Sequence, residues 1–223
     1  ELLTDSTAAW WLMLLMGASL AWLMPSFIHR FLSGSLAIWS LVMVCIAWPI
    51  VWLMPALVVG VMAWLWLNES KWLLDSERVR PIAYAFSLAA LQMHSLTLLN
   101  PKELADVGGR YQVSYNQWLI SLNESLLAAI FVAIVAMLLQ RYRVSYSSKQ
   151  GIIALAAALC LALISQEAAG LTVAWSLILL GFAHSNRVLL AIGTASFWLY
   201  LSRYYYSLDM TLLNKSYLLI ATE

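Results

Sequence analysis

Charged residues are scarce in this chain of 223 residues. Only 10% of the sequence is Asp, Glu, Lys or Arg, whereas 63% is hydrophobic. Soluble domains carry about 25% charged residues, so this sequence has too few of them to cover a surface that faces water. The twelve basic and eleven acidic residues leave a formal charge of +1, which excludes nucleic-acid binding through an excess of positive charge.

Cysteine and the familiar catalytic motifs are sparse as well. Cys45 and Cys160, the only two cysteines, each lie inside an apolar run, which excludes a disulfide framework and a CxxC metal site. The sequence contains no H-E-x-x-H, G-x-S-x-G or P-loop motif. We therefore expect no resident metal ion and no cofactor.

Long apolar runs fill most of the chain. A bilayer core about 30 Å thick needs about 20 apolar residues per helix. The sequence therefore predicts an all-α fold, a polytopic transmembrane bundle of about eight spans plus a partial ninth, in a single domain over residues 1–223. The apolar runs lie at 8–24, 36–67, 81–99, 118–139, 151–165, 168–183 and 188–201, and the long run 36–67 is taken as two spans. The partial ninth halts at Glu223 and the first residue is not Met, so we expect truncation at both ends.

Prolines and polar residues indicate where these runs are divided. Leu36–Leu67 contains Pro49 and Pro55, so it forms either two short spans that meet near Trp48 or one span with a kinked interfacial piece. We expect the polar patch 26–35 and the charged stretch 68–80 to connect spans. Pro81 is suited to the first turn of the helix that follows, and Asn123 to a helix cap at the start of the run 118–139.

The distribution of lysine and arginine predicts the orientation in the membrane. Two crossings between residues 36 and 67 put eight basic residues on one side and four on the other, whereas one crossing gives seven against five. The side with eight carries Arg30, Lys71, Arg78, Arg80, Arg141, Arg143, Lys149 and Arg187. The positive-inside rule puts this side in the cytoplasm, and it makes the loop 100–124 periplasmic.

Two polar positions beside or inside the spans are candidates for ligand or partner contacts. His94 lies centrally in the run 82–99, which has no second His, Asp or Glu at helical spacing, so an interhelical hydrogen bond is favoured over proton relay or metal ligation. Arg187 ends the polar turn 184–187 at a helix start, where a phosphate or headgroup can bind. A solvated turn is the simpler interpretation of that segment.

The densest polar cluster spans residues 202–216. Its candidate contact residues are Arg203, Tyr205, Asp209 and Lys215. We favour a hairpin on the outer surface with a tyrosine belt and structural ion pairs, and the alternative is a site for a ligand or partner.

A resemblance to a known family is carried by the same part of the chain. Residues 204–216 read YYYSLDMTLLNKS and are preceded by Gly181–Ala183 and Asn186–Leu190. This stretch resembles the C-terminal part of a bacterial multi-pass inner-membrane family catalogued as a domain of unknown function, typically encoded beside GDYXXLXY-family membrane proteins. The resemblance implies a location in the bacterial inner membrane and a membrane partner, and it assigns no catalytic residue.

Three functions are compatible with these features. We favour a non-enzymatic subunit of a membrane assembly, which contacts lipids and either another membrane protein or a second copy of itself. The first alternative is a transporter of a small molecule or ion, because the interrupted run 36–67 is typical of broken transport helices. The second is a lipid- or glycan-modifying enzyme with its site on the outer face.

Overall fold

A computed structural model describes residues 2–46, 48–72, 76–97, 117–165 and 170–207 of the chain. Within these ranges the chain forms eight α-helices and two short 3-10 helices and contains no strand, which confirms the predicted all-α class. The elements are α1 (Leu2–Leu23), α2 (Phe27–Cys45), η1 (Pro49–Leu53), α3 (Met54–Leu67), η2 (Glu69–Trp72), α4 (Ser76–Thr97), α6 (Gln117–Arg141), α7 (Lys149–Ile164), α8 (Leu171–Ala183) and α9 (Arg187–Ser207).

Three segments are long and apolar enough to cross a membrane. They are Phe27–Cys45, Ile50–Leu67 and Trp118–Arg141. Shorter apolar helices lie at Thr7–Leu23, Lys149–Ile164 and Leu171–Ala183. The chain therefore has helices of the kind that membranes require, although these lengths alone identify three spans rather than the expected eight.

Prolines divide the long apolar run at the expected place. The run consists of two helices, α2 and α3, that are separated beside Trp48 by the short helix η1. Pro49 and Pro55 occupy the first positions of η1 and α3, where a missing N–H breaks no intrahelical bond. The polar patch 26–35 is not a connection, however, because α2 already begins at Phe27.

The start of α4 also differs from the expectation. The helix begins at Ser76, so Pro81 lies inside it rather than in its first turn, and residues 76–80 are helical. A proline at position 81 has no N–H for the carbonyl group of Glu77 four residues earlier. Arg30 of α2 donates to that carbonyl oxygen from Nη1 at 3.1 Å.

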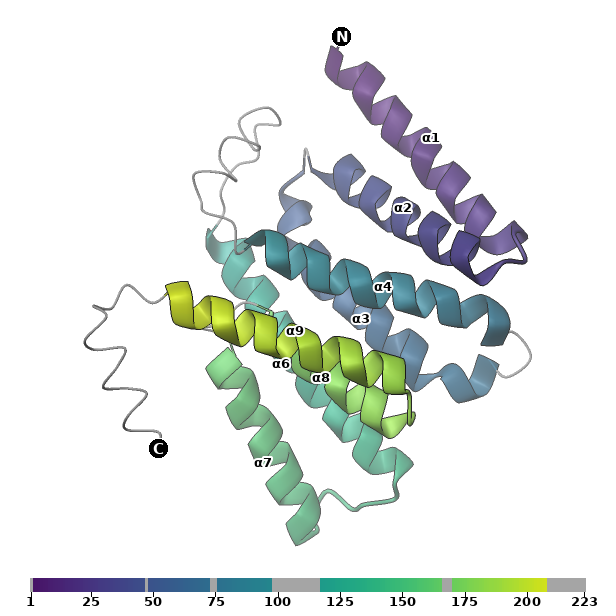
Figure 1. Ribbon diagram of the computed structural model, residues 1–223. Coiled ribbons are helices and arrows are strands. Elements are labelled where there is room, and N and C mark those ends of the chain that lie inside the picture. Colours follow the sequence, from purple (N-terminus) through teal and green to yellow (C-terminus); the bar gives the residue numbers. More distant parts are fainter. Residues whose placement is uncertain (1, 47, 73–75, 98–116, 166–169, 208–223) are drawn as a thin grey trace.

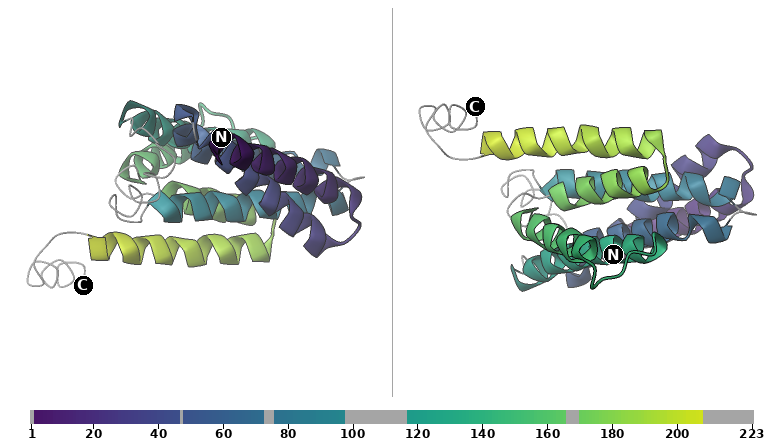
Figure 2. Two further views of the ribbon diagram at one scale, coloured as in Figure 1. Left: turned by 90° about the horizontal axis from the view of Figure 1, so that it is seen from above. Right: turned by 90° about the horizontal axis from the view of Figure 1, so that it is seen from below.

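Helices that follow one another along the described chain run antiparallel (Figure 1). α4 contacts α2 on one side and α3 on the other, and α3 contacts α6. α1 packs mainly on α2, α7 packs on α6, and α9 forms an outer layer on α8 (Figure 2). The centre of the bundle is filled by fully buried side chains, among them Met62, Trp66, Ile134, Leu177 and Leu189.

Hydrogen bonds from polar side chains connect the helices across the bundle. Trp39 Nε1 donates to Gln92 Oε1, Trp66 Nε1 to Ser87 Oγ, Tyr200 Oη to the Leu91 carbonyl, and the Ala56 backbone N–H to Asn123 Oδ1. Asn123 was expected to cap its own helix, but α6 begins six residues earlier at Gln117. It instead accepts from a backbone N–H in the first turn of α3, 67 residues away in the sequence.

Glycines allow α8 and α9 to approach closely. A Cβ atom at Gly181 would lie 2.7 Å from the backbone N of Leu190, and one at Gly193 would lie 2.9 Å from that of Ile178. Gly170, which precedes α8, has φ +91° and lies against the ring of Tyr200. These positions therefore need glycine for space, and Gly170 needs it for its backbone conformation as well.

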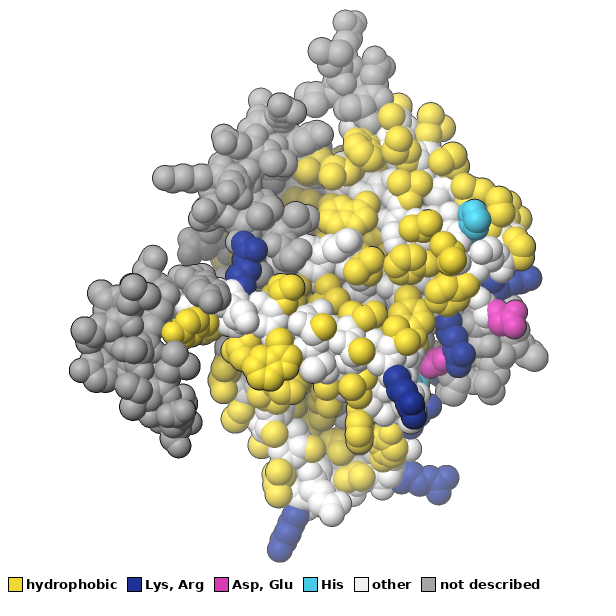
Figure 3. Space-filling model, in the orientation of Figure 1, with side chains coloured by type: hydrophobic (Ala, Val, Ile, Leu, Met, Phe, Trp, Pro, Cys, Tyr) yellow, Lys and Arg dark blue, Asp and Glu magenta, His cyan; other side chains and the backbone are white. Residues whose placement is uncertain are grey.

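The sides of the bundle expose large apolar residues. Leu12, Leu15 and Trp22 of α1 are 68%, 64% and 60% exposed. Apolar side chains cover most of the face in Figure 3, and basic side chains lie along its lower and right-hand margins. Such extensive apolar surface is unusual on a water-soluble monomer and is suited to lipid or to other membrane chains.

Candidate functional site

The connections α1–α2, α3–α4, α6–α7 and α8–α9 lie at the same end of the bundle, at the lower right of Figure 1. We call this the basic end. It carries the eight basic residues that the sequence analysis assigned to one side. Polar contacts join the helix termini there, from α2 to α4, from α4 to η2, from α4 to the α8–α9 turn, and from α6 to His184 beside that turn.

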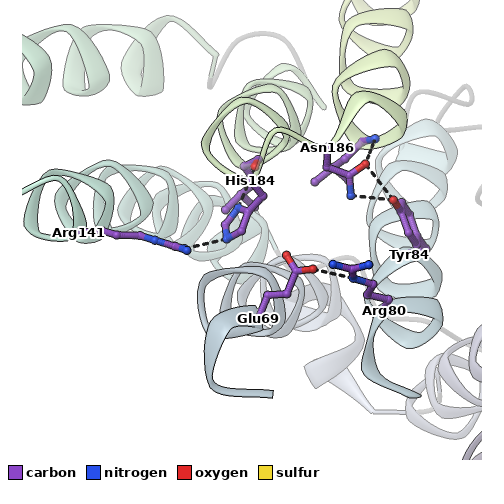
Figure 4. A network of polar contacts seen from close by, with 8 residues as sticks. Glu69, Arg80, Tyr84, Arg141, His184 and Asn186 are labelled. Atoms are coloured by element: carbon purple, nitrogen blue, oxygen red, sulfur yellow. Dashed lines mark hydrogen bonds and ion pairs between the residues drawn. The ribbon is translucent and has the colours of Figure 1, made fainter. Parts of the chain in front are cut away.

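A polar cleft of about 280 Å³ opens at the basic end. We call it the polar cleft, and its lining residues are Glu69, Arg80, Tyr84, His184, Ser185, Asn186 and Arg187. η2 supplies the carboxylate, α4 supplies Arg80 and Tyr84, and the α8–α9 connection supplies the remaining four residues. Figure 4 shows Glu69, Arg80, Tyr84, His184 and Asn186 converging from separate elements.

An ion pair forms one wall of the polar cleft. Arg80 Nε donates to Glu69 Oε1 at 2.8 Å, with the Glu69 side chain 18% exposed and the Arg80 side chain 58% exposed. The guanidinium group of Arg80 lies between Glu69 and Tyr84 (Figure 4). Because this bond uses Nε, the contact to Glu69 leaves the two terminal nitrogens of Arg80 available for other acceptors.

A pair of hydrogen bonds holds the opposite wall. Tyr84 Oη donates to Asn186 Oδ1 at 2.9 Å and accepts from Asn186 Nδ2 at 2.7 Å. Asn186 Oδ1 also accepts from the backbone N–H of Leu189 at 3.2 Å, so Asn186 is the N-cap of α9. The ring of Trp66 packs edge-on against Tyr84 at 5.1 Å between centroids. Tyr84 therefore fixes the position at which α9 begins.

The turn between α8 and α9 is tightly held. The Asn186 backbone N–H donates to the Gly181 carbonyl oxygen at 2.8 Å, and Ser185 adopts φ 51°. This geometry resembles the left-handed turns that often end helices, and it satisfies a carbonyl of the last turn of α8. The first residue of α9, Arg187, is thereby placed at the edge of the polar cleft.

His184 adopts a defined tautomer. Its Nδ1 lies 2.9 Å from the carbonyl oxygen of Leu180, an acceptor, so Nδ1 carries a proton. Its Nε2 lies 2.8 Å from Nη1 of Arg141, which can only donate, so Nε2 accepts. In this arrangement Nδ1 donates and Nε2 accepts, and the imidazole orients a third guanidinium group toward the polar cleft (Figure 4).

The charge around the polar cleft is positive. Arg80, Arg187 and the adjacent Arg141 contribute three positive charges, against the single negative charge of Glu69. Arginine presents several N–H donors in one plane, which suits the oxygens of carboxylates and phosphates. The arrangement is therefore able to bind an anion.

The residues singled out in the sequence do not form one site. Arg187 borders the polar cleft, whereas Arg203 and Tyr205 lie 16 and 18 residues further along α9. At 1.5 Å per residue, 16 residues correspond to about 24 Å along a helix. Asp209 and Lys215 lie outside the described residues. The apolar run was expected to end at Leu201, whereas α9 continues through Ser207, and the rest of the hairpin favoured for residues 202–216 lies outside the described residues.

His94 lies far from the polar cleft in the sequence of α4 and is 1% exposed. Its Nδ1 donates to the carbonyl oxygen of Ala90 at 2.8 Å. This bond lies within α4, and the interhelical hydrogen bond favoured from the sequence stays a prediction. The loop expected at 100–124 is likewise shorter, because α6 includes residues 117–124, and residues 100–116 lie outside the described ranges.

Four contributors to the site went unrecognised in the sequence. Glu69, Arg80, Tyr84 and Arg141 come from three separate elements. Charged residues next to the ends of apolar runs were counted there only for the orientation. Nothing in their spacing indicates that η2, α4 and α6 converge on the α8–α9 turn.

Comparison with known proteins gives a family assignment. No curated protein and no solved structure matches the chain. A family model described as "Domain of unknown function (DUF4401)" matches residues 1–222. The match extends well beyond residues 181–216, on which the resemblance noted in the sequence rested. The chain therefore belongs to the DUF4401 family.

Proposed function

We propose that the chain is a multi-pass protein of the bacterial inner membrane and that all eight described α-helices cross the bilayer. The exposed apolar side chains of α1 and the other flanking helices support this arrangement, since they need a lipid or protein surround. The basic end faces the cytoplasm, in line with the positive-inside rule. Helices shorter than the bilayer core are extended by tryptophans and snorkelling basic side chains at their ends.

Impermeant labelling tests this topology. In a chain in which Cys45 and Cys160 are replaced by Ala, a single new cysteine is introduced by Arg143→Cys or by Asp106→Cys. A membrane-impermeant maleimide added to intact spheroplasts should label the Asp106→Cys chain and leave the Arg143→Cys chain unlabelled until the membrane is opened. The reverse pattern would overturn the proposed orientation.

Within the membrane, the chain acts as a non-enzymatic subunit of an assembly. One observation carries this proposal: buried polar side chains form bonds between helices, as in Trp66–Ser87 and Tyr200–Leu91, and Trp39–Gln92 adds such a bond at the surface. Such bonds stabilise a fixed scaffold. The apolar flanks of that scaffold suit contact with another membrane protein or with a second copy of the chain.

Gentle affinity purification from native membranes tests the subunit role. The proposal expects one protein at a constant molar ratio, or a defined homo-oligomer, in mass spectrometry and light scattering of the purified material. A scrambled-tag purification from the same membranes provides the background. A chain that purifies as a monomer at every detergent concentration would contradict the proposal.

A carrier is the second candidate, favoured by the interrupted helix pair. The break at η1 exposes the first turn of α3, and Asn123 of α6 occupies one of its backbone donors at 3.0 Å. Broken helices of transporters bind cargo at such free ends. Flux of small anions or amino acids into proteoliposomes, lost in Pro49→Ala/Pro55→Ala chains, would favour the carrier over the subunit, and no flux across the panel would remove it.

A further inference from the structure

We infer that the polar cleft binds a phosphate group, and that Arg80 and Arg187 are its principal ligands. This inference goes beyond the proposed function, because a subunit and a carrier are equally able to hold such a group. It rests on three features of the basic end: the charge of the cleft, the fixed position of its donors and its size.

The charge favours an anion. Nε of Arg80 donates to Glu69 at 2.8 Å, which partly neutralises the carboxylate. The same contact does not use the two terminal nitrogens of Arg80. Arg187 adds a second cation on the facing side, at the start of a 21-residue helix. The positive end of the α9 dipole lies at the same edge, where it adds to the attraction for an anion.

The helices that carry the two arginines are held in place before any ligand arrives. Tyr84 and Asn186 bond reciprocally at 2.9 and 2.7 Å, and Asn186 caps α9, so the position of Arg187 is tied to α4. Arg80 is carried by the same helix, one turn before Tyr84. A ligand therefore finds two guanidinium groups whose backbone separation is already set, which lowers the entropy cost of binding.

The size of the cleft suits a phosphate group better than a larger anion. Its volume of about 280 Å³ lies at the lower limit of ordinary ligand pockets, which start at about 300 Å³. Phosphate accepts several charge-assisted hydrogen bonds, and the two arginines supply matching donors, whereas the hydroxyl proton of Tyr84 is already donated to Asn186. A nucleotide or an acidic peptide would extend well outside this space.

The phosphate group could be inorganic or could belong to a lipid. A second cleft of about 290 Å³, lined by Pro25, Phe27, Glu77 and Arg80, adjoins the first at Arg80. Pro25 and Phe27 of its mixed lining offer apolar contacts to the glycerol and the first methylenes of a phospholipid, beside the charged Glu77 and Arg80. Both sources present the same group to Arg80 and Arg187, so the experiment has to separate them.

The test uses the full chain purified in a non-ionic detergent at constant chloride concentration. Intrinsic tryptophan fluorescence reports both binding and unfolding, because Trp66 packs against Tyr84 and lies 6.4 Å from His184 between ring centroids. The probes are inorganic phosphate, dihexanoyl phosphatidic acid and, as the matched phosphate-free lipid, dihexanoylglycerol. We expect at least one phosphate-bearing probe to bind saturably and to raise the unfolding temperature, and dihexanoylglycerol to do neither.

Two variants separate this site from general charge attraction. Arg187→Gln removes one ligand and should weaken the binding about tenfold, the effect of one lost charge-assisted hydrogen bond. Arg143→Gln makes the same change of charge at the basic end but outside the lining of the cleft, and it should alter affinity less than about twofold. If Arg187→Gln fails to fold, Arg80→Gln replaces it.

Each outcome decides a point. Binding of phosphatidic acid alone supports the site and assigns it to a lipid headgroup, whereas binding of both phosphate probes supports the site and assigns it to the free anion as well. No saturable binding of either probe would overturn the inference. Equal loss of affinity in Arg187→Gln and Arg143→Gln would also overturn it, since the attraction would then come from the whole basic end.

Discussion

Nη1 of Arg30 donates to the backbone carbonyl oxygen of Glu77 at 3.1 Å, which links the start of α2 to the start of α4. That carbonyl is the one that Pro81 leaves without an intrahelical donor. Arg30 is only 6% exposed, so its charge is largely removed from water at this position. The helix defect created by the proline and the buried cation therefore compensate one another.

This relationship predicts a coupling between the two positions. Arg30→Met should lower the free energy of unfolding by about 1.5–3 kcal/mol, because a charged hydrogen bond is lost and a buried carbonyl is left unsatisfied. In a Pro81→Ala background the new N–H at residue 81 reaches the carbonyl of Glu77, so the same Arg30→Met change should cost at least about 1 kcal/mol less. Equilibrium unfolding in mixed micelles gives the four values of the cycle. If the effects of the two substitutions on the free energy of unfolding were additive, Arg30 would stabilise the protein through a contact other than the Glu77 carbonyl.

Tyr200 gives a second prediction. Its hydroxyl group donates to the carbonyl oxygen of Leu91 at 2.6 Å in a buried position. Tyr200→Phe should therefore lower the unfolding free energy by about 0.5–1.5 kcal/mol. Tyr142→Phe is the matched control, because its hydroxyl bond to the Ala183 carbonyl is exposed and measures 3.3 Å. Equal destabilisation by the two substitutions would contradict the importance of burial.

The hydrogen bond of Asn123 gives a third prediction. Asn123→Ala removes the acceptor for the backbone N–H of Ala56 and should cost about 1–2 kcal/mol of unfolding free energy, as loss of a helix cap does. Asn123→Asp keeps an acceptor and should recover part of that loss. The control is Ser125→Ala, two residues later on the exposed face of α6, which should change the free energy of unfolding by less than about 0.5 kcal/mol. Thermal unfolding followed by tryptophan fluorescence measures all three.

Two glycines in helices should respond oppositely to alanine. Gly181→Ala places a Cβ 2.7 Å from the backbone of Leu190, so α8 and α9 must move apart, and we expect a loss of about 1–3 kcal/mol. Gly60→Ala meets its nearest atom, Cδ1 of Ile130, at an ordinary 3.6 Å. Alanine is the better helix former by about 1 kcal/mol, so this chain should be as stable as the parent or more so. Chemical denaturation of both chains checks the difference in sign.

The sequence predicts the elements of this fold better than their contacts. Hydropathy and the positions of Pro49 and Pro55 predicted a division of the run 36–67 near Trp48, where α2 and α3 are separated, but they left open whether the run crosses once or twice. They failed at α4, where Pro81 was taken for a helix start although Ser76 and Glu77 begin the helix. The error arose because tertiary compensation by Arg30 makes an internal proline tolerable, and such compensation is not visible along the chain.

The candidate site was predictable only in part. The turn 184–187 was identified from its polar residues at a helix start, which is a local signal. Tyr84 and Asn186 are 102 residues apart, and no periodicity connects them. Arg187 and Arg203 were assigned from the sequence to opposite sides of the membrane, and they lie at opposite ends of α9. Sequence patterns show which helix faces are apolar, but they do not show which helix lies against which.

The bonds that α4 makes to the last two helices have a consequence for biosynthesis. Asn186, the partner of Tyr84, is synthesised 102 residues after it, and Tyr200, the partner of Leu91, is synthesised 109 residues after it. At about 5–20 residues per second, a ribosome needs roughly 5–20 s to add that much chain. During this interval α4 is present without Asn186 and Tyr200, so neither bond is able to form. The contacts that join α4 to the start and the later turns of α9 are therefore completed only after α9 has been synthesised.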